Sequence, residues 1–583
     1  MSDATPFSSS LTLIGLLLVF LTFSGPMEAM GQTTFLSTPS GTNGACEKNP
    51  DQALNWEDPN CWDQESVPNT NSDSVVIQKG HLVEIRSSSI TIGALKVEDG
   101  GFNQSRLLLD GNATLTVDNE NSLTGSVTFG GTSVIVLLEK DQNFGDGYDG
   151  GSIVLDGNIT DNDADLRTST GSNEGFFKLT GSAQTLDLQN TISRLETNAG
   201  VNIELDSDLT VEELIANGSP GSSGLTITDG AASGTQTFIL NGNGTDSNVA
   251  GNLTVGNLTF DLEKNLTVGG DLFVNENGGQ LQLSGNTLTV DGNTTNSGAI
   301  KFEGGTFDTP GNYTHFTGGS TDFGGGRLEI GGDLNTRDEA NTFTASGSSI
   351  TVFTGENSPQ KISGDFSDGN SNGFQDVRIT AGTKVDPADA LREGGSGDPV
   401  LIGGEFIVED GSPGGQYGTK EGQLGPEASE VGFRGSLFEV RSSEGFFSAE
   451  VNFFPPSGTP TDVKGVIFSD MLVSGGTVDL KETFEINGKL EINNGNTLSI
   501  DGGVLTLNGD AQVNGDLDPR NTNGLIDGGV TFGSGESQTL GGATNVDVNL
   551  GNATLSAGTS LDVSPVEAGL VTADLTLNNN SKL

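Results

Sequence analysis

Four oxygen-bearing side chains in one short segment are the best candidates for chemistry in this 583-residue chain. They alternate along the string DGNSNGFQD and are Asp368, Asn370, Asn372 and Asp376. Carboxylate and amide oxygens at this spacing match the first half of a calcium-binding loop, with Gly373 at its turn. The acid that closes such a loop at its twelfth position is missing, because Ile379 stands there. The segment therefore predicts either a calcium site, the only cofactor we expect, or an ordinary Asx-rich turn.

Histidine is scarce, which limits acid–base and nucleophilic catalysis. The two imidazoles are His81, in a Gly-His corner, and His315, in the polar string NYTHFTGG. A Ser-His-Asp triad needs one of them, and no serine lies in a G-x-S-x-G frame. The sequence also has no P-loop, no H-E-x-x-H and no C-x-x-C motif. We therefore predict no catalytic residues and a protein that is not an enzyme.

Paired carboxylates keep one enzymatic alternative open. Polysaccharide lyases and glycosidases of parallel β-helix fold use Asp or Glu with an Arg or Lys on one face, and this chain has 78 Asp and Glu residues. Few rings are available to line a sugar cleft, because the chain has 3 Tyr and 2 Trp. A carbohydrate-active protein that binds or cleaves polysaccharide is the alternative function.

The charge excludes one class of partner. With 25 Lys and Arg against 78 acids, the formal net charge is −53, whereas nucleic-acid binding needs a basic face. Such a surface repels itself, and salt relieves the repulsion because the Debye length falls to about 3 Å at 1 M. The composition therefore predicts no nucleic-acid partner and a halophilic protein. A surface that recruits divalent cations and an ordinary acidic secreted protein are the alternatives.

Short strands and tight corners must position all of these residues. In residues 484–510, FEINGKLEINNGNTLSIDGGVLTLNGD, apolar residues recur at i and i+2. This alternation indicates half-buried strands, and the N-G, D-G and G-G pairs supply the positive φ of corners. Corners recur every six to eight residues, which is faster than the ~8–12 typical of sandwiches. We predict an all-β, right-handed parallel β-helix or β-solenoid with an N-terminal cap; tandem β-sandwiches are the alternative.

Recurring residues support stacked turns. Asn, Asp and Thr recur at similar corners, as expected if they align into ladders, and the 30 Phe are expected to stack in a dry core. Turns of ~20–30 residues rising ~4.8 Å each would build a rod on the order of 100 Å long. The strings LTGSAQTLDL, FTGENSPQKISG and FGSGESQTLGG place Gln184, Gln360 and Gln538 before an aliphatic strand residue, at separations of 176 and 178. They suggest internal duplication.

The N-terminal residues indicate export. Residues 11–23 form an apolar run of thirteen, which suits a signal-peptide core and is too short to span a bilayer. Small residues around Met30 place the cleavage before Gln32, and nothing downstream resembles a transmembrane segment. In an exported protein the only two cysteines, Cys46 and Cys61, predict one disulfide.

Residues 55–97 carry a resemblance to a known family. The order of features is Trp56, Asp58-Pro59, Trp62, Pro68, a strand over 75–77 and Gly80-His81. This segment resembles the eight-glycine domain of secreted bacterial surface proteins. The resemblance implies a β-solenoid that is adhesin-like and lies outside the cell or on its outer surface.

The two tryptophans have an interpretation that does not depend on the resemblance. The first turn of a solenoid exposes an open sheet edge, which Trp56 and Trp62 could cover while a Cys46–Cys61 bridge holds the covering loop. The alternative is that the rings stack on a sugar.

The predicted organisation has five parts. They are a signal peptide at 1–31, a cap segment at 32–100, β-solenoid repeats at 101–383, a Pro/Gly-rich insertion at 384–470, and further repeats at 471–583 that stop inside the array, as in a truncated gene model. The insertion holds seven of the eighteen prolines. We expect a secreted or cell-surface structural or adhesive rod whose partners are extracellular macromolecules, polysaccharide among them.

Overall fold

The computed structural model describes residues 33–583 with gaps, so the predicted signal peptide lies outside the described residues. The gaps are residues 39, 42–43, 47–53, 87–88, 99–104, 111–112, 118–126, 130–133, 138–151, 162–164, 168–175, 189–190, 231–235, 243–245, 277, 317–318, 337–342, 345–347, 356–359, 365–373, 390–399, 403–404, 409–415, 418–429, 434–435, 441–445, 448–449, 454, 456–459, 466, 469, 521–527, 534–536, 544–546, 564–565 and 567–568.

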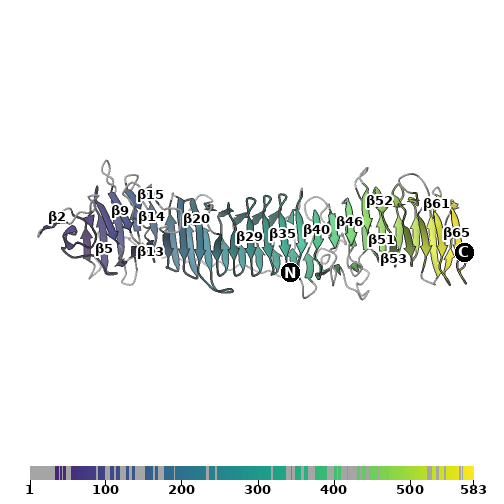
Figure 1. The fold of residues 1–583 in the computed structure, drawn as a ribbon, viewed down its shortest axis with the longest axis horizontal. Helices are drawn as coiled ribbons and strands as arrows, with labels where there is room; N and C mark the ends of the chain where they lie inside the picture. Colours follow the sequence, from purple (N-terminus) through teal and green to yellow (C-terminus); the bar gives the residue numbers. More distant parts are fainter. Residues whose placement is uncertain are drawn as a thin grey trace, which may run out of the picture.

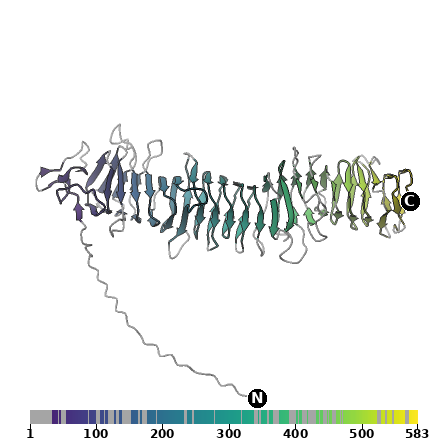
Figure 2. The same ribbon diagram turned by 90° about the horizontal axis from the view of Figure 1, so that it is seen from below.

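The chain folds as a parallel β-solenoid, in which short strands coil into turns that stack on one another (Figure 1). The result is a long rod with its first strands at the purple end and its last strands at the yellow end, and Figure 2 shows the same row of strands from below. Among the described residues, the one helical element is the 3-10 turn η1 (Pro59–Cys61). The all-β solenoid predicted from the sequence is confirmed.

Three strands make up each turn in the most regular part of the rod. The first ladder holds β24 (Leu253–Val255), β27 (Leu272–Val274), β30 (Thr294–Asn296), β33 (Tyr313–His315) and β36 (Leu334–Thr336). The second holds β25 (Thr259–Leu262), β28 (Gln280–Gln282), β31 (Ala299–Lys301) and β34 (Ser320–Asp322). The third holds β26 (Leu266–Val268), β29 (Thr287–Val290), β32 (Thr306–Thr309) and β35 (Arg327–Ile330).

The same arrangement returns near the C-terminal end of the described chain. One ladder runs through β51 (Asp470–Val473), β54 (Leu490–Ile492), β57 (Ala511–Val513) and β60 (Ser537–Gly542). The second runs through β52 (Thr477–Leu480), β55 (Thr497–Ile500) and β58 (Asp516–Asp518). The third runs through β53 (Phe484–Ile486), β56 (Val504–Leu507), β59 (Gly529–Phe532), β62 (Asn552–Leu555) and β65 (Asp574–Leu577).

Strand pairing separates the solenoid from the sandwich alternative. Leu272 pairs with Leu253 on one side and with Thr294 on the other, so these turns take 19 and 22 residues. The first length falls just below the expected ~20–30 residues and the second lies within that range. Sandwiches pair sequence neighbours as antiparallel hairpins, and among the described strands only β2 (Ser40–Gly41) and β3 (Gly44–Ala45) pair that way. Tandem sandwiches are therefore excluded.

Alternation along each strand fills the core. Inward side chains of successive turns form columns, and their phenylalanines stack. The ring centroids of Phe302 and Phe323 are 4.8 Å apart at an interplanar angle of 22°, and those of Phe406 and Phe438 are 4.7 Å apart at 23°. Such pairs contribute about 0.5–1.5 kcal/mol beyond the burial of their area. The predicted stacking of Phe in the core is confirmed.

A ladder of Asn and Asp side chains runs along one corner of the rod. Each side chain accepts a hydrogen bond, through Oδ1, from the backbone N–H one turn later. The bonds join Asp271 N to Asn252 (2.8 Å), Asn293 N to Asp271 (2.7 Å), Asn312 N to Asn293 (3.0 Å), Asp333 N to Asn312 (2.7 Å) and Lys361 N to Asp333 (2.8 Å). The recurrence of Asn and Asp at corners therefore has a physical cause, because their Oδ1 atoms bond to the backbone of the next turn.

The three glutamines noted in the sequence occupy equivalent corners. Each side chain is 2 % exposed, and its Nε2 donates to two backbone carbonyls of the previous turn. Those carbonyls belong to Leu155 and Gly157 for Gln184, to Ile330 and Gly332 for Gln360, and to Leu507 and Gly509 for Gln538, at 2.6–3.2 Å. The residue after each glutamine donates its N–H to an Asn or Asp side chain, namely Asn158, Asp333 or Asp510. We call this arrangement the Gln clamp.

The Pro/Gly-rich stretch at 384–470 does not stand apart from the stack where the structure describes it. Strand β43 (Glu405–Val408) pairs with β40 (Asp376–Ile379) before it and with β46 (Leu437–Val440) after it. The register partners Phe406 and Phe438 are 32 residues apart, so the turns here are longer. Longer connections dilute the alternation, which is why the sequence suggested an insertion.

No helix among the described residues is long and apolar enough to cross a membrane.

The Gln clamp generates a stability prediction. Replacing Gln538 with Leu removes two donors and leaves two carbonyls without this partner, which we expect to cost roughly 2–4 kcal/mol. Urea denaturation, together with hydrogen exchange of residues 504–513, measures the effect. The matched control is Gln282→Leu, because Gln282 lies on the outer face of β28 and is half-buried. Equal stability of the two variants would show that the clamp does not hold the turns together.

Candidate functional site

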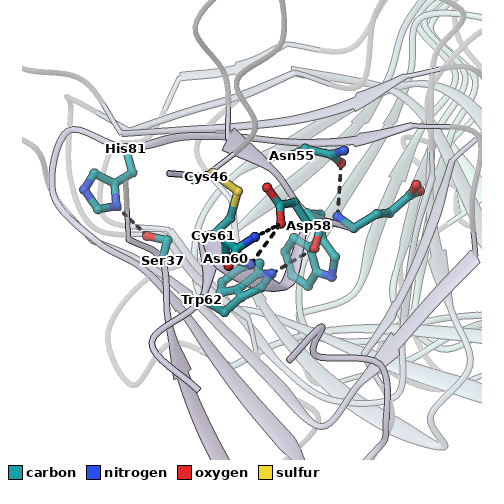
Figure 3. Close-up of a disulfide and its surroundings, with 10 residues drawn as sticks. Ser37, Cys46, Asn55, Asp58, Asn60, Cys61, Trp62 and His81 are labelled. Atoms are coloured by element: carbon teal, nitrogen blue, oxygen red, sulfur yellow. Dashed lines mark hydrogen bonds between the residues drawn. A yellow bond between two sulfur atoms is a disulfide. The ribbon is translucent and has the colours of Figure 1, made fainter. Parts of the chain in front are cut away.

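The N-terminal segment is the first candidate site, because it holds both cysteines, both tryptophans and one of the two histidines (Figure 3). Strand β1 (Thr33–Leu36) pairs in parallel with β5 (Asp73–Ile77), and β4 (Leu54–Asn55) pairs with β6 (Leu82–Arg86). Residues before the first regular turn are thereby fastened to its strands. This is the position that a cap must occupy.

A short turn brings the two cysteines together. Asp58 precedes η1 and accepts a hydrogen bond from Asn60 N at 2.9 Å, while Pro59 begins the turn with the fixed φ that suits it. Cys61 closes η1 and forms a disulfide with Cys46, with their Cα atoms 4.6 Å apart. The predicted disulfide pairing is confirmed.

The two tryptophans are core residues of this segment. Both are 0 % exposed, and their ring centroids lie 4.8 Å apart in an edge-to-face arrangement. Trp62 Nε1 donates to Trp56 O at 2.8 Å, and Trp56 Nε1 donates to Pro68 O at 3.1 Å. Covering an edge explains this burial, whereas sugar stacking needs an accessible ring face. The geometry therefore favours the capping role over the sugar-stacking alternative.

The cysteines and Asp58 also form a group whose possible metal ligands lie within 4.8 Å of one another. Metal binding through Cys needs free thiolates. Here the two sulfurs are bonded to each other, which leaves a single carboxylate. The residues present do not fit a metal centre.

His81, which is half-buried, contacts the buried Ser37. The Ser37 hydroxyl lies 2.7 Å from His81 Nδ1 and also accepts a hydrogen bond from Gln78 N at 2.8 Å. Ser37 is 0 % exposed, so its oxygen cannot meet a substrate in this conformation. This contact joins Ser37, directly after β1, to the corner before β6. Sequence reasoning missed this contact, because the two residues are 44 positions apart.

His315 lies inside the rod and not on its surface. It ends β33 with 2 % exposure, beside Tyr313 on the same inward face. Burial lowers the pKa of His315 from its usual value, and the polar backbone of Gly319 beside the ring opposes part of that shift. Burial likewise raises the pKa of Tyr313 to about 12, against hydrogen bonds with Thr321 and Asn296. Both side chains are therefore neutral near pH 7.

The predicted calcium residues are only partly described. Asp368, Asn370 and Asn372 lie outside the described residues. Asp376 begins β40, and its Oδ1 accepts a hydrogen bond from Glu405 N, one turn later, at 2.9 Å. Asp376 thus has the same corner role as the Asn and Asp ladder. Calcium binding and stability in high salt stay predictions of the sequence.

One lysine gathers three carboxylates on the outer face of the rod. Lys481 Nζ lies 3.3 Å from Asp479 and 3.5 Å from Asp462 and from Asp501, which come from successive turns. Burial alone would lower the pKa of Lys481, but the three carboxylates outweigh it and the pKa is raised. Such a cluster offsets part of the repulsion among stacked acids.

A second cluster holds both acidic residues and an arginine, the residue types that the carbohydrate-active alternative requires. Asp308 and Glu329 are register partners on adjacent turns, and the Arg327 guanidinium contacts Glu329. Burial raises the pKa of Asp308, as do the charges of Glu329 and Asp291, whereas Arg327 lowers it. A carboxyl with a raised pKa beside a second acidic residue is the arrangement that a general acid needs.

Comparison with protein-family models, with curated proteins and with solved structures found no match to this chain.

The disulfide generates a prediction that the tryptophans themselves report. Because the chain has only two tryptophans, both in the cap, their fluorescence follows the cap alone. Replacing Cys46 and Cys61 with Ala should destabilise the cap by about 3 kcal/mol. We expect the red shift of the emission at lower urea concentration than in the native chain, with the β-sheet circular dichroism unchanged at that concentration. Coincident transitions in both proteins would contradict a separately stabilised cap.

Burial of His315 generates a pH prediction. Above the unfolded pKa of 6.5 the ring is neutral in both states, so this residue adds no pH dependence there. Below 6.5 the unfolded chain binds a proton that the folded chain resists, and the free energy of unfolding falls by up to about 1.4 kcal/mol per pH unit until the folded pKa is reached.

Urea denaturation at pH 7.5 and pH 5 measures this loss. His315→Gln should lose less stability between the two pH values than the native chain does, while His81→Asn accounts for the other imidazole. Equal losses in the native chain and in His315→Gln would contradict the prediction.

Proposed function

We propose that this protein is a secreted or cell-surface rod with a structural or adhesive role and no enzymatic activity. The observation that supports it best is the unbroken stack of parallel strands. A single 17-stranded sheet runs from β1 to β47 (Phe446–Phe447), and at about 4.8 Å per strand it spans roughly 80 Å. Length and stiffness are the properties that such a stack provides.

The use of the candidate chemical groups adds support. Both cysteines and both tryptophans hold the cap, the Ser37 hydroxyl bonds to His81, and Asp376 bonds to the next turn. Each of these side chains serves the stacking or the capping of turns. Secretion and the resemblance to eight-glycine surface proteins belong to the same proposal and rest on the sequence.

A carbohydrate-active function is the second candidate, favoured by the cluster of Asp308, Glu329 and Arg327. Two acidic residues and an arginine lie on one outer face. Asp308 is the group that could donate a proton to a leaving sugar oxygen.

A depolymerisation assay separates the two functions. The full chain, folded in molar salt, is incubated with neutral and acidic polysaccharides, and new reducing ends are counted. The structural proposal predicts no turnover above buffer. Turnover that falls at least 100-fold in Asp308→Asn, but not in the control Asp261→Asn on the neighbouring ladder, would overturn the proposal in favour of the enzyme.

Adhesion requires its own measurement. The same polysaccharides, immobilised, would retain a rod that binds them, and retention with no release of product supports an adhesive role. No retention would leave the structural role alone.

A further inference from the structure

A polar section interrupts the apolar core in the middle of the rod. The inward positions of β30 hold Thr294 and Asn296, and those of β33 hold Tyr313 and His315. All four side chains are between 0 % and 2 % exposed. The equivalent positions of the preceding strand, β27, hold apolar residues that pair in register with β30. Buried polar groups need hydrogen-bond partners, so each of these side chains should have one.

Part of this section is satisfied internally. Asn296 Nδ2 donates to Ser320 O at 2.9 Å and to Thr321 Oγ1 at 3.1 Å. The Tyr313 hydroxyl lies 2.7 Å from the same Thr321 Oγ1. These contacts fix the Asn296 amide with its nitrogen toward β34. The amide oxygen, Asn296 Oδ1, therefore points away from these partners in β34.

Three atoms in the section have no partner. They are Thr294 Oγ1, Asn296 Oδ1 and His315 Nε2, and each is inaccessible to solvent. A buried polar atom without a hydrogen bond costs about 1–3 kcal/mol. Two adjacent turns would then carry several such penalties at one place in the rod. Ordered water commonly supplies the missing partner in protein interiors.

The spacing of two of these residues suits a bridging molecule. Asn296 and His315 are register partners on adjacent parallel strands, which stand about 4.8 Å apart. No direct hydrogen bond joins Asn296 Oδ1 to His315 Nε2. One water can reach two side chains at neighbouring inward positions, because two hydrogen bonds of about 2.8 Å span up to about 5.6 Å. Water can donate to Asn296 Oδ1 and can either donate to or accept from the imidazole nitrogen. It therefore suits either ring tautomer.

The His315 ring is also held in place. A Cβ at Gly319 would lie 2.6 Å from His315 Cδ2 and Nε2, so the ring edge packs closely against this glycine. The ring cannot move far to find another partner without displacing the backbone at Gly319. The site is thus defined by one strand pair and one glycine.

We propose that Asn296 and His315 hold an internal water molecule between two turns of the rod. Water fits better than a metal ion, because the unpartnered atoms are one imidazole nitrogen and two neutral oxygens. A divalent cation there would bring a buried charge with no carboxylate among these atoms to balance it. The polar section is therefore a hydration site inside the core.

A crystal structure of the full chain at about 1.5 Å resolution tests the proposal directly. We expect a density peak about 2.7–3.2 Å from both Asn296 Oδ1 and His315 Nε2. A peak about 2.1 Å from the nitrogen with anomalous signal would identify a metal and overturn the proposal. Continuous packing with no peak would overturn it as well.

Paired substitutions give an independent readout. Asn296→Leu and His315→Leu should each raise the unfolding equilibrium constant roughly 10- to 100-fold, because each leaves the other group with a poorly held water. The double variant removes both partners, so its effect should be smaller than the product of the two. Asn335→Leu, on the outer face of the next strand in the ladder, is the matched control and should change little. Effects that multiply would contradict a shared water.

Discussion

The parallel register between turns is the constraint on which the rest of the structure depends. Successive turns stand about 4.8 Å apart, and side chains at the corners hydrogen-bond from one turn to the next, which keeps the strands in register. The ladder from Asn252 to Asp333 does this with side-chain oxygens, and the Gln clamp does it with a donor that holds two carbonyls at once. Once the register is fixed, inward side chains fall into columns, which is why Phe302 stacks on Phe323 and Phe406 stacks on Phe438.

The same constraint explains where the chemically versatile residues are used. A stack of turns leaves one open edge at its start, and the N-terminal segment covers it with two buried tryptophans and a disulfide. The Ser37–His81 contact fastens that segment to the first strands. The two cysteines, the two tryptophans, Ser37 and His81 thus serve the stack and its cap. Charged side chains lie on the outer faces, where Lys481 contacts acids from successive turns.

Much of the fold could be predicted from the alternation of apolar and polar residues, because every turn of a solenoid repeats the same short strands and corners. The i, i+2 alternation at Phe484 and Ile486 indicated a strand, and the Gln strings indicated equivalent corners. Two features could not be predicted. Long turns such as the one between Phe406 and Phe438 dilute the alternation, so 384–470 looked like an insertion. The pairing of Asn296 with His315 inside the core could not be predicted either, because the identity of register partners depends on turn length, which the sequence shows only approximately.

Small-angle X-ray scattering of the full chain in molar salt tests the central claim, that one continuous stack of turns runs along the molecule. The account predicts a rod with a longest dimension on the order of 100 Å along the stack and a single, constant cross-section, since each turn adds about 4.8 Å. A bent or several-lobed particle, as expected of separate domains joined by linkers, would contradict it.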